Sequence, residues 1–250
     1  MRKLRKVTEA EAIGEFLRNE FYEPDYNRDR DQFEAVVLKQ DYGNPHENAI
    51  RRALLYRRRG HMMRELPSDT EWWQVELDAH DLAQVHVFPR AQWRKISNGS
   101  FRIGDVVDRI RQRNYRDGGD RVIAKIQQIR YRLQSDMFTP STVLLIGVDE
   151  TQPLTIFEGN HRLAAAMLVS PAMLQSRFHI LCGFSPRMTE SCWYRTDLPN
   201  LWRYFKNRVT HIYDPEADVK KLLEQLPPAY STPQQLANTV AAEKFSETQS

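Results

Sequence analysis

The sequence is poor in cysteine, in long apolar runs and in net charge, and each of these shortages argues against a class of protein or of binding site. Only Cys182 and Cys192 occur in 250 residues, too few for a disulfide framework, and neither has the spacing of a zinc site. No apolar run approaches the roughly 18 residues that a membrane span needs. The basic N-terminal residues lack the apolar segment of a signal peptide. We therefore expect reduced thiols, a cytoplasmic location and no membrane partner.

The net charge is +3, from 36 basic and 33 acidic residues. This excess is too small to indicate a nucleic-acid-binding protein by itself. The composition is otherwise that of a globular chain, and 250 residues are enough for a hydrophobic core without metal or disulfide support. One or two domains are expected.

Four segments differ in their residue pattern. Residues 1–68 are strongly charged and have helical periodicity, whereas residues 69–186 alternate strand-like and helix-like apolar runs. Residues 187–226 are aromatic and basic, and residues 227–250 are rich in Pro, Ser, Thr and Gln. We predict an α/β (α+β) fold in which a compact core of mixed sheet and helices carries a helical N-terminal extension. The third segment should pack on the core as a C-terminal extension, and the fourth should be a flexible tail.

Within the predicted core, β-branched and aromatic runs indicate strands, and apolar stripes at three- and four-residue spacing indicate helices. The strands are expected at residues 71–78, 83–88, 141–150, 154–157 and 177–184. The clearest amphipathic helix is predicted at residues 120–134, where Ile123, Ile126, Ile129 and Leu133 share one face. A turn is expected at residues 114–119.

The run TIFEGNHRLAAAML places five polar or flexible residues between a predicted strand and a predicted helix. We refer to these five, residues 158–162, as the EGNHR joint. A strand that enters a helix through a glycine turn leaves backbone N–H groups free at the helix start, and these favour an anion such as phosphate.

Each residue type of the joint suits such a site. Gly159 allows backbone and ligand to approach closely, and Arg162 could hold a phosphate with two hydrogen bonds. His161 can donate to a phosphate oxygen or act as an acid or base. Glu158 can position a divalent ion or accept a proton, and Asn160 can cap the helix and orient a ligand.

Purely structural roles fit the same residues one by one. Glu158 could be a carboxylate near a helix N-terminus, Asn160 only a cap, His161 a packed side chain and Arg162 half of an ion pair. The coincidence of all five at one joint favours the binding site.

The run STVLLIGVDETQPLTIFEGNHRLAAAML resembles the signature of the ParB/sulfiredoxin-like superfamily, and the resemblance covers roughly residues 71–185. In that superfamily two strands lead into a Gly-x-His-Arg-like joint and an Ala-rich helix, and the joint binds nucleotide phosphates. The resemblance thus implies a compact mixed sheet with a nucleotide site at residues 158–162.

Members of the superfamily differ at this joint. Sulfiredoxins carry a catalytic cysteine before the His-Arg pair, where this chain has Asn160, so that chemistry is not expected. Residues 186–250 contain no convincing helix-turn-helix of the ParB type. The joint is closest to that of free-serine kinases, whose activity needs a second, upstream carboxylate. Glu76, Asp78 and Asp81 are the candidates, and the sequence does not choose among them.

Fic-type AMP transferases also have an acidic-Gly-Asn motif, but they need a histidine four residues before the acid. Leu154 occupies that position here. Strands before the motif also disagree with an all-helical fold, so this family is not expected.

Three other features have both a functional and a structural explanation. The loop at residues 93–105 carries Arg94, Ser100 and Arg102 and is either a second phosphate-binding loop or an exposed turn. Arginine-rich helices between residues 109 and 132 are either a nucleic-acid surface or a solvated face. In the C-terminal segment the aromatic residues either stack on bases or pack onto the sheet. Packing is favoured for all four of them: Trp193, Trp202, Tyr204 and Phe205.

The sequence therefore predicts a nucleotide-binding enzyme that transfers a phosphoryl group to a small hydroxyl-bearing acceptor with Mg²⁺. The nucleotide is expected to be ATP or ADP, and CTP remains possible. Glu158 and His161 are the predicted catalytic residues, with Glu158 also the metal ligand. The predicted phosphate ligands are Gly159, Asn160, Arg162, Arg94, Ser100 and Arg102. The alternatives are a non-catalytic module that binds nucleotide and nucleic acid, and a metal-dependent nuclease.

Overall fold

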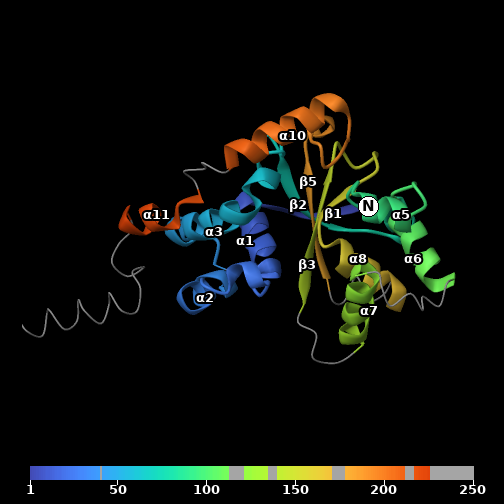
Figure 1. Cartoon of the computed structure of the whole chain (residues 1–250), viewed down its shortest axis with the longest axis horizontal. Coiled ribbons are helices and arrows are strands. Elements are labelled where there is room, and N and C mark those ends of the chain that lie inside the picture. The colour runs from blue at the N-terminus through green and yellow to red at the C-terminus, as the bar shows by residue number, and fades with distance from the viewer. Residues whose placement is uncertain (40, 113–120, 135–139, 171–177, 212–216, 226–250) are drawn as a thin grey trace, which may run out of the picture.

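In the computed structural model, five strands form one mixed sheet in the order β1-β2-β5-β3-β4 (Figure 1). The residues that the structure describes are 1–39, 41–112, 121–134, 140–170, 178–211 and 217–225. The strands are β1 (Arg2–Val7), β2 (Glu71–Glu76), β3 (Ser141–Gly147), β4 (Thr155–Glu158) and β5 (Phe178–Phe184). Strands β3 and β5 are parallel, and the other neighbouring pairs are antiparallel.

Helices cover both faces of the sheet, so the fold is an α/β sandwich (Figure 1). One layer contains α1 (Glu9–Glu20), η1 (Pro24–Tyr26), α2 (Arg30–Leu38) and α3 (Pro45–Met63), with α11 (Val219–Gln225) packed on α3. The other contains α4 (Ala79–Gln84), α5 (Ala91–Ile96), α6 (Ile103–Gln112), α7 (Arg121–Leu133) and α8 (Asn160–Val169). Helix α10 (Leu198–His211) follows η2 (Met188–Glu190) and contacts α3.

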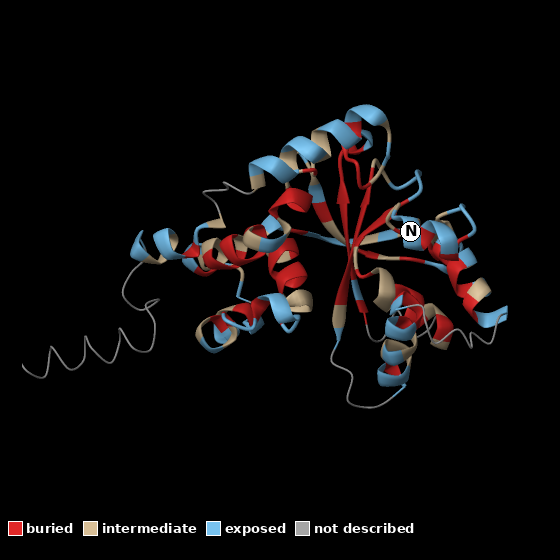
Figure 2. Cartoon of the chain, in the orientation of Figure 1, coloured by how far each residue is buried: buried red, intermediate tan, exposed pale blue. Residues whose placement is uncertain are grey.

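The inner strand β3 explains why two helical layers are needed. Its side chains are apolar at successive positions, and a strand that is apolar on both faces must be covered on both. Leu144 and Ile146 are buried against the α1–α3 layer, whereas Val143 and Leu145 are buried against α6, α7 and α8. Figure 2 shows the resulting band of buried residues along the sheet and on the inner sides of both layers. Each fully buried aliphatic side chain contributes about 1.5–3 kcal/mol.

The N-terminal segment differs from the predicted all-helical extension. Residues 2–7 form β1, the edge strand that pairs with β2. Four of its six residues are basic, and charged side chains suit an exposed edge strand. Helix α1 begins at a Thr8 cap, whose hydroxyl accepts a hydrogen bond from the Glu11 amide. The helices that follow form one of the two layers against the sheet and do not stand apart from it.

One further prediction is corrected. Residues 83–88 do not form a strand: Asp78 and Asp81 form a capping box that starts α4, and only two isolated bridges at His86, to Arg102 and Thr155, follow. The turn predicted at residues 114–119 and the tail at residues 227–250 lie outside the described residues.

Candidate functional site

The EGNHR joint has the strand–turn–helix geometry that its sequence predicts. Strand β4 ends at Glu158, Gly159 has a φ of 105°, and α8 begins at Asn160. A Cβ atom at Gly159 would lie 3.2 Å from Val143 Cγ2 and 3.3 Å from Arg162 Nη2. Glycine is therefore required by the left-handed backbone and by close packing at once. The N-cap residue, Gly159, has no side chain to cap α8, and the first N–H groups of the helix carry the positive end of the helix dipole.

Asn160 does not cap the helix, which corrects that part of the prediction. Its Oδ1 accepts a hydrogen bond of 3.1 Å from the backbone N–H of Phe88. This bond ties the segment between α4 and α5 to the start of α8. Asn160 therefore fixes the position of the chain beside the joint.

Glu158 and Arg162 form a partly buried ion pair, with each side chain 15% exposed. Arg162 also donates to the Thr142 carbonyl at 3.2 Å. Asn19, from α1 on the other layer, donates to Glu158 Oε2 at 3.0 Å and to the same carbonyl at 2.8 Å. Burial raises the pKa of the Glu158 carboxyl, and Arg162 and Asn19 offset part of this rise. The pair thus brings the joint and α1 together across β3.

His161 is packed and neutral at pH 7. Its ring lies 5.2 Å from the ring of Trp93, measured between centroids. Burial lowers the pKa of His161 to about 4, with further contributions from the charges of Lys125 and Arg162. A neutral imidazole can donate one hydrogen bond to a phosphate oxygen or accept one proton.

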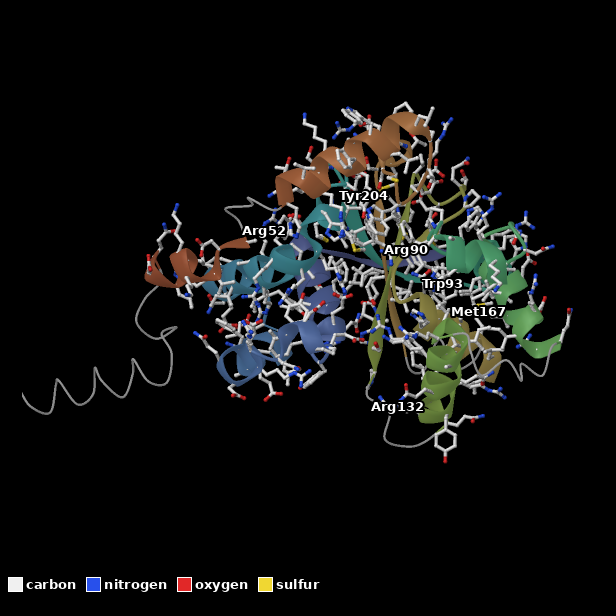
Figure 3. The ribbon with its side chains drawn as sticks, viewed as in Figure 1. Arg52, Arg90, Trp93, Arg132, Met167 and Tyr204 are labelled. Carbon is white, nitrogen blue, oxygen red and sulfur yellow. The ribbon has the colours of Figure 1, made fainter. Side chains whose placement is uncertain are left out.

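A cavity of about 1360 Å³ lies over the joint, between the α1–α3 layer and helices α5, α7 and α8. Glu158, Gly159, Asn160, His161 and Arg162 all line it. Its other basic side chains are Arg18, Arg59, Arg90, Lys125 and Arg132, and its aromatic ones are Phe16, Tyr22, Phe88, Trp93, Phe157 and Trp193. Figure 3 labels three of the lining residues, Arg90 and Trp93 at α5 and Arg132 on α7. The volume is that of a typical ligand site or larger.

Besides Glu158, the carboxylates that line this cavity come from α1 and the segment that follows it, not from the predicted upstream segment. Glu20 accepts from Arg59 Nε at 2.6 Å, and Glu23 pairs with Lys125 of α7 at 2.9 Å. The Glu23–Lys125 pair joins the two walls. Sequence reasoning missed Asn19, Glu20 and Glu23 because the resemblance begins near residue 71.

The three expected upstream carboxylates have other partners. Glu76 pairs with Arg2, Asp78 is the N-cap of α4, and Asp81 pairs with the N-terminal amine of Met1 at 2.6 Å. None of these three carboxylates lines the cavity.

The predicted second phosphate loop does not reach the cavity either. Arg94, Ser100 and Arg102 are exposed and lie outside the lining. The loop closes on itself, since Ser97 Oγ accepts from the Phe101 amide at 3.0 Å. From this stretch only Trp93 contributes to the site.

The arginines of α6 and α7 are divided between two roles. Arg111 donates to the carbonyl of Met167 at 2.7 Å and so links α6 to α8. Arg132 lines the cavity.

The cavity fits a Mg²⁺ ion only if the ion is bound to nucleotide phosphates. Among the described residues, no three His, Cys, Asp or Glu side chains are grouped closely enough to hold a metal. Mg²⁺ that arrives with nucleotide phosphates needs one or two carboxylates, and Glu20, Glu23, Asp25 and Glu158 all line the cavity. The residues fit a phosphate-bound ion and do not form an all-protein site.

The described helices include none that is both long and apolar enough to cross a bilayer.

Comparison of the chain with models of protein families, with curated proteins and with solved structures finds no match. The likeness to the ParB/sulfiredoxin-like superfamily therefore remains a prediction from the motif and its strand–turn–helix setting.

Proposed function

We propose that the chain is a cytoplasmic enzyme that binds a nucleotide over the EGNHR joint and transfers a phosphoryl group to a small hydroxyl-bearing acceptor. One observation carries the proposal. A single cavity brings the uncapped N-terminus of α8 together with basic side chains from both helical layers and with a set of aromatic rings.

The phosphates would lie at the first turn of α8. There the free N–H groups and the helix dipole attract an anion. Lys125 lines the same cavity, where it pairs with Glu23 until a phosphate competes for its ammonium group. Arg59 and Arg132 supply further positive charge to the same cavity. The charge of Arg162 is balanced by Glu158 until a phosphate competes for the guanidinium.

The base would lie against the aromatic wall. Phe88 and Trp193 stack with ring centroids 3.9 Å apart, and the guanidinium of Arg90 lies 4.9 Å from the Phe88 centroid. Trp93, which lies beside His161, also lines the cavity. Aromatic and apolar walls with few charges suit a base, whose recognition depends on stacking.

Transfer would depend mainly on position and charge neutralisation. When bound, Mg²⁺ would neutralise charge on the phosphates. Glu158 would accept the acceptor's hydroxyl proton, because its raised pKa makes it a stronger base than an ordinary carboxylate. For this role Arg162 must leave Glu158 for the phosphate. ATP or ADP is the proposed nucleotide, with CTP as the further candidate.

The ion pair also favours a second function, a module that binds nucleotide without catalysis. In the structure Glu158 Oε2 accepts hydrogen bonds from both Asn19 and the Arg162 guanidinium in one partly buried network. If the pair persists when nucleotide is bound, Glu158 has no free role as a base.

Binding can be tested by thermal shift with ATP, ADP, CTP and GTP, each with and without Mg²⁺. A ligand at 100 times its Kd stabilises the native state by about 2.7 kcal/mol, which raises Tm by about 5–10 °C for a chain of this size. The rise should be smaller in Lys125→Ala and unchanged in Arg94→Ala, an exposed basic residue outside the cavity. No rise with any nucleotide, or equal rises in both variants, would refute this site.

Catalysis is tested separately with the nucleotide that binds. Phosphoryl transfer to small alcohols and hydroxy acids is followed by ³¹P NMR for wild type and Glu158→Gln. Loss of transfer with binding retained supports the enzyme. Binding without transfer to any acceptor in either protein supports the non-catalytic module.

A further inference from the structure

Helix α10 is oriented opposite to what its sequence predicts. Its large apolar side chains are exposed: Leu198 by 82%, Leu201 by 43%, Trp202 by 70%, Phe205 by 57% and Val209 by 46%. The prediction that Trp202 and Phe205 pack onto the sheet is therefore wrong. These five residues form one stripe, which we call the α10 stripe.

The helix is held to the body of the protein by its polar face. Asn200 is buried and donates to the carbonyls of Thr189 and Arg195 at 2.9 and 2.8 Å. Asn207 donates to Glu65 Oε1 at 2.6 Å. The Tyr204 ring packs edge-on against Trp193 at 5.9 Å between centroids. These contacts fix the rotation of α10, so the stripe cannot turn inward without losing buried hydrogen bonds.

The stripe is large enough to form an interface. With about 200 Å² for a large apolar side chain, the exposed fractions add up to about 600 Å². A monomer's largest apolar patch usually reaches about 300–600 Å². Two copies of the stripe would bury about 1,200 Å², the lower limit of a stable protein–protein interface.

We propose that the α10 stripe binds the same stripe of a second copy of this chain, with the two helices antiparallel. The spacing supports this partner. Leu198, Trp202, Phe205 and Val209 are separated by four, three and four residues, the a/d spacing of helices that pack on one another. This order is the same from either end, as a two-fold axis between residues 203 and 204 requires. Leu198 then faces Val209 of the partner subunit, and Trp202 faces Phe205 of the partner subunit.

The charges that flank the stripe select the antiparallel arrangement. Lys206 and Arg208 border the stripe on its two sides, and no acidic residue occurs in α10. In the antiparallel register Lys206 faces Pro199 of the partner subunit, and Arg208 faces Leu201 of the partner subunit. The long apolar stems of both side chains can cover these neighbours while the charges stay in water. A parallel pair would instead place Lys206 beside Arg208 of the partner subunit, and like charges repel.

The oligomeric state tests the proposal directly. Sedimentation equilibrium of the full chain should give a dimer, twice the 29.5 kDa of one chain, at micromolar concentration. Trp202→Ala combined with Phe205→Ala should give 29.5 kDa with an unchanged circular dichroism spectrum, because both side chains are exposed. Tyr131→Ala, which removes an exposed aromatic ring from α7, is the matched control and should stay dimeric. A monomeric wild type, or a double variant that remains dimeric, would overturn the proposal.

Cysteine cross-linking tests the direction of the helices. A mixture of Leu198→Cys and Val209→Cys chains should form a disulfide-linked dimer, whereas either chain alone should not. In the antiparallel pair two copies of residue 198 lie about 16 Å apart along the axis, at 1.5 Å per residue. Self-linking of Leu198→Cys would show a parallel pair. If wild type is monomeric and sediments with anionic phospholipid vesicles, the stripe serves a lipid surface and the proposal fails.

Discussion

Replacement of Arg162 by alanine should destabilise the protein by about 3–5 kcal/mol at pH 7, the usual cost of removing one partner of a buried ion pair. The side chain is 15% exposed and pairs with Glu158 while it donates to the Thr142 carbonyl. Without it, the Glu158 carboxylate keeps its hydrogen bond from Asn19 but has lost its counter-charge. This loss would be a large fraction of a typical stability of about 5–15 kcal/mol.

The size of the loss should depend on pH in a defined direction. Burial raises the pKa of Glu158 above its ordinary 4.5, so the folded state favours the protonated carboxyl. The stability that Glu158 contributes is fully present below its pKa in the unfolded chain. It is lost as the pH rises through its pKa in the folded protein. In Arg162→Ala the opposing charge is gone, so the folded pKa rises further. The deficit of the variant should therefore be largest at pH 7 and should shrink toward pH 4.5.

Urea denaturation at both pH values measures these differences. Glu158→Gln alone and the double variant Glu158→Gln, Arg162→Ala complete a double-mutant cycle that isolates the coupling energy. The double variant should recover part of the stability lost in Arg162→Ala, because it no longer buries a charge. A loss below about 1 kcal/mol, or a loss equal at both pH values, would show that water solvates Glu158, and the account of the joint would be wrong.

Two other substitutions test the site. Gly159→Ala should cost about 2–4 kcal/mol, because its positive φ adds about 1–2 kcal/mol of strain to the close contact with Val143. Gly99 also has a positive φ, of 90°, but a Cβ added there would meet no atom within 4 Å, so Gly99→Ala should lose stability only through backbone strain. Equal losses of stability in the two variants would refute the packing argument. Wild type should lose stability as pH falls from 6.5 to 4, because the pKa of His161 is lowered to about 4 and the unfolded chain binds its proton first. His161→Gln should make this decline shallower in acid denaturation curves, and an unchanged slope would place the imidazole in water.

The joint could be predicted because its signals are local. β-Branched residues, a glycine and an Ala-rich run follow one another in TIFEGNHRLAAAML, so strand, turn and helix needed no distant information. The same holds for the helix around Ile126 and for the strand at β3. Strand β3 also contained an unused signal, since its unbroken apolar run already implied cover on both faces.

The features that the sequence did not predict depend on contacts between residues far apart in the chain. Asn19 lies 139 residues from Glu158 in sequence, and no local pattern marks it as a partner. Residues 83–88 alternate like a strand, but the Asp78–Asp81 capping box starts a helix just before them. Trp202 and Phe205 were expected inside because aromatic residues usually pack in cores, yet the buried hydrogen bonds of Asn200 decide which face of α10 turns inward.

The hydrogen bonds of Asn19 make the candidate site composite, and this affects how it could vary. The joint and the aromatic wall belong to residues 86–193, whereas Asn19, Glu20, Glu23 and Arg59 come from the layer that precedes β2. A fragment of residues 69–186 would therefore keep the joint but lose one wall and the support of Glu158. Changes in the first 63 residues could therefore alter that wall and the support of Glu158 while the strand–turn–helix joint itself stays the same. The two parts of the cavity are encoded in separate stretches of one gene and could diverge independently.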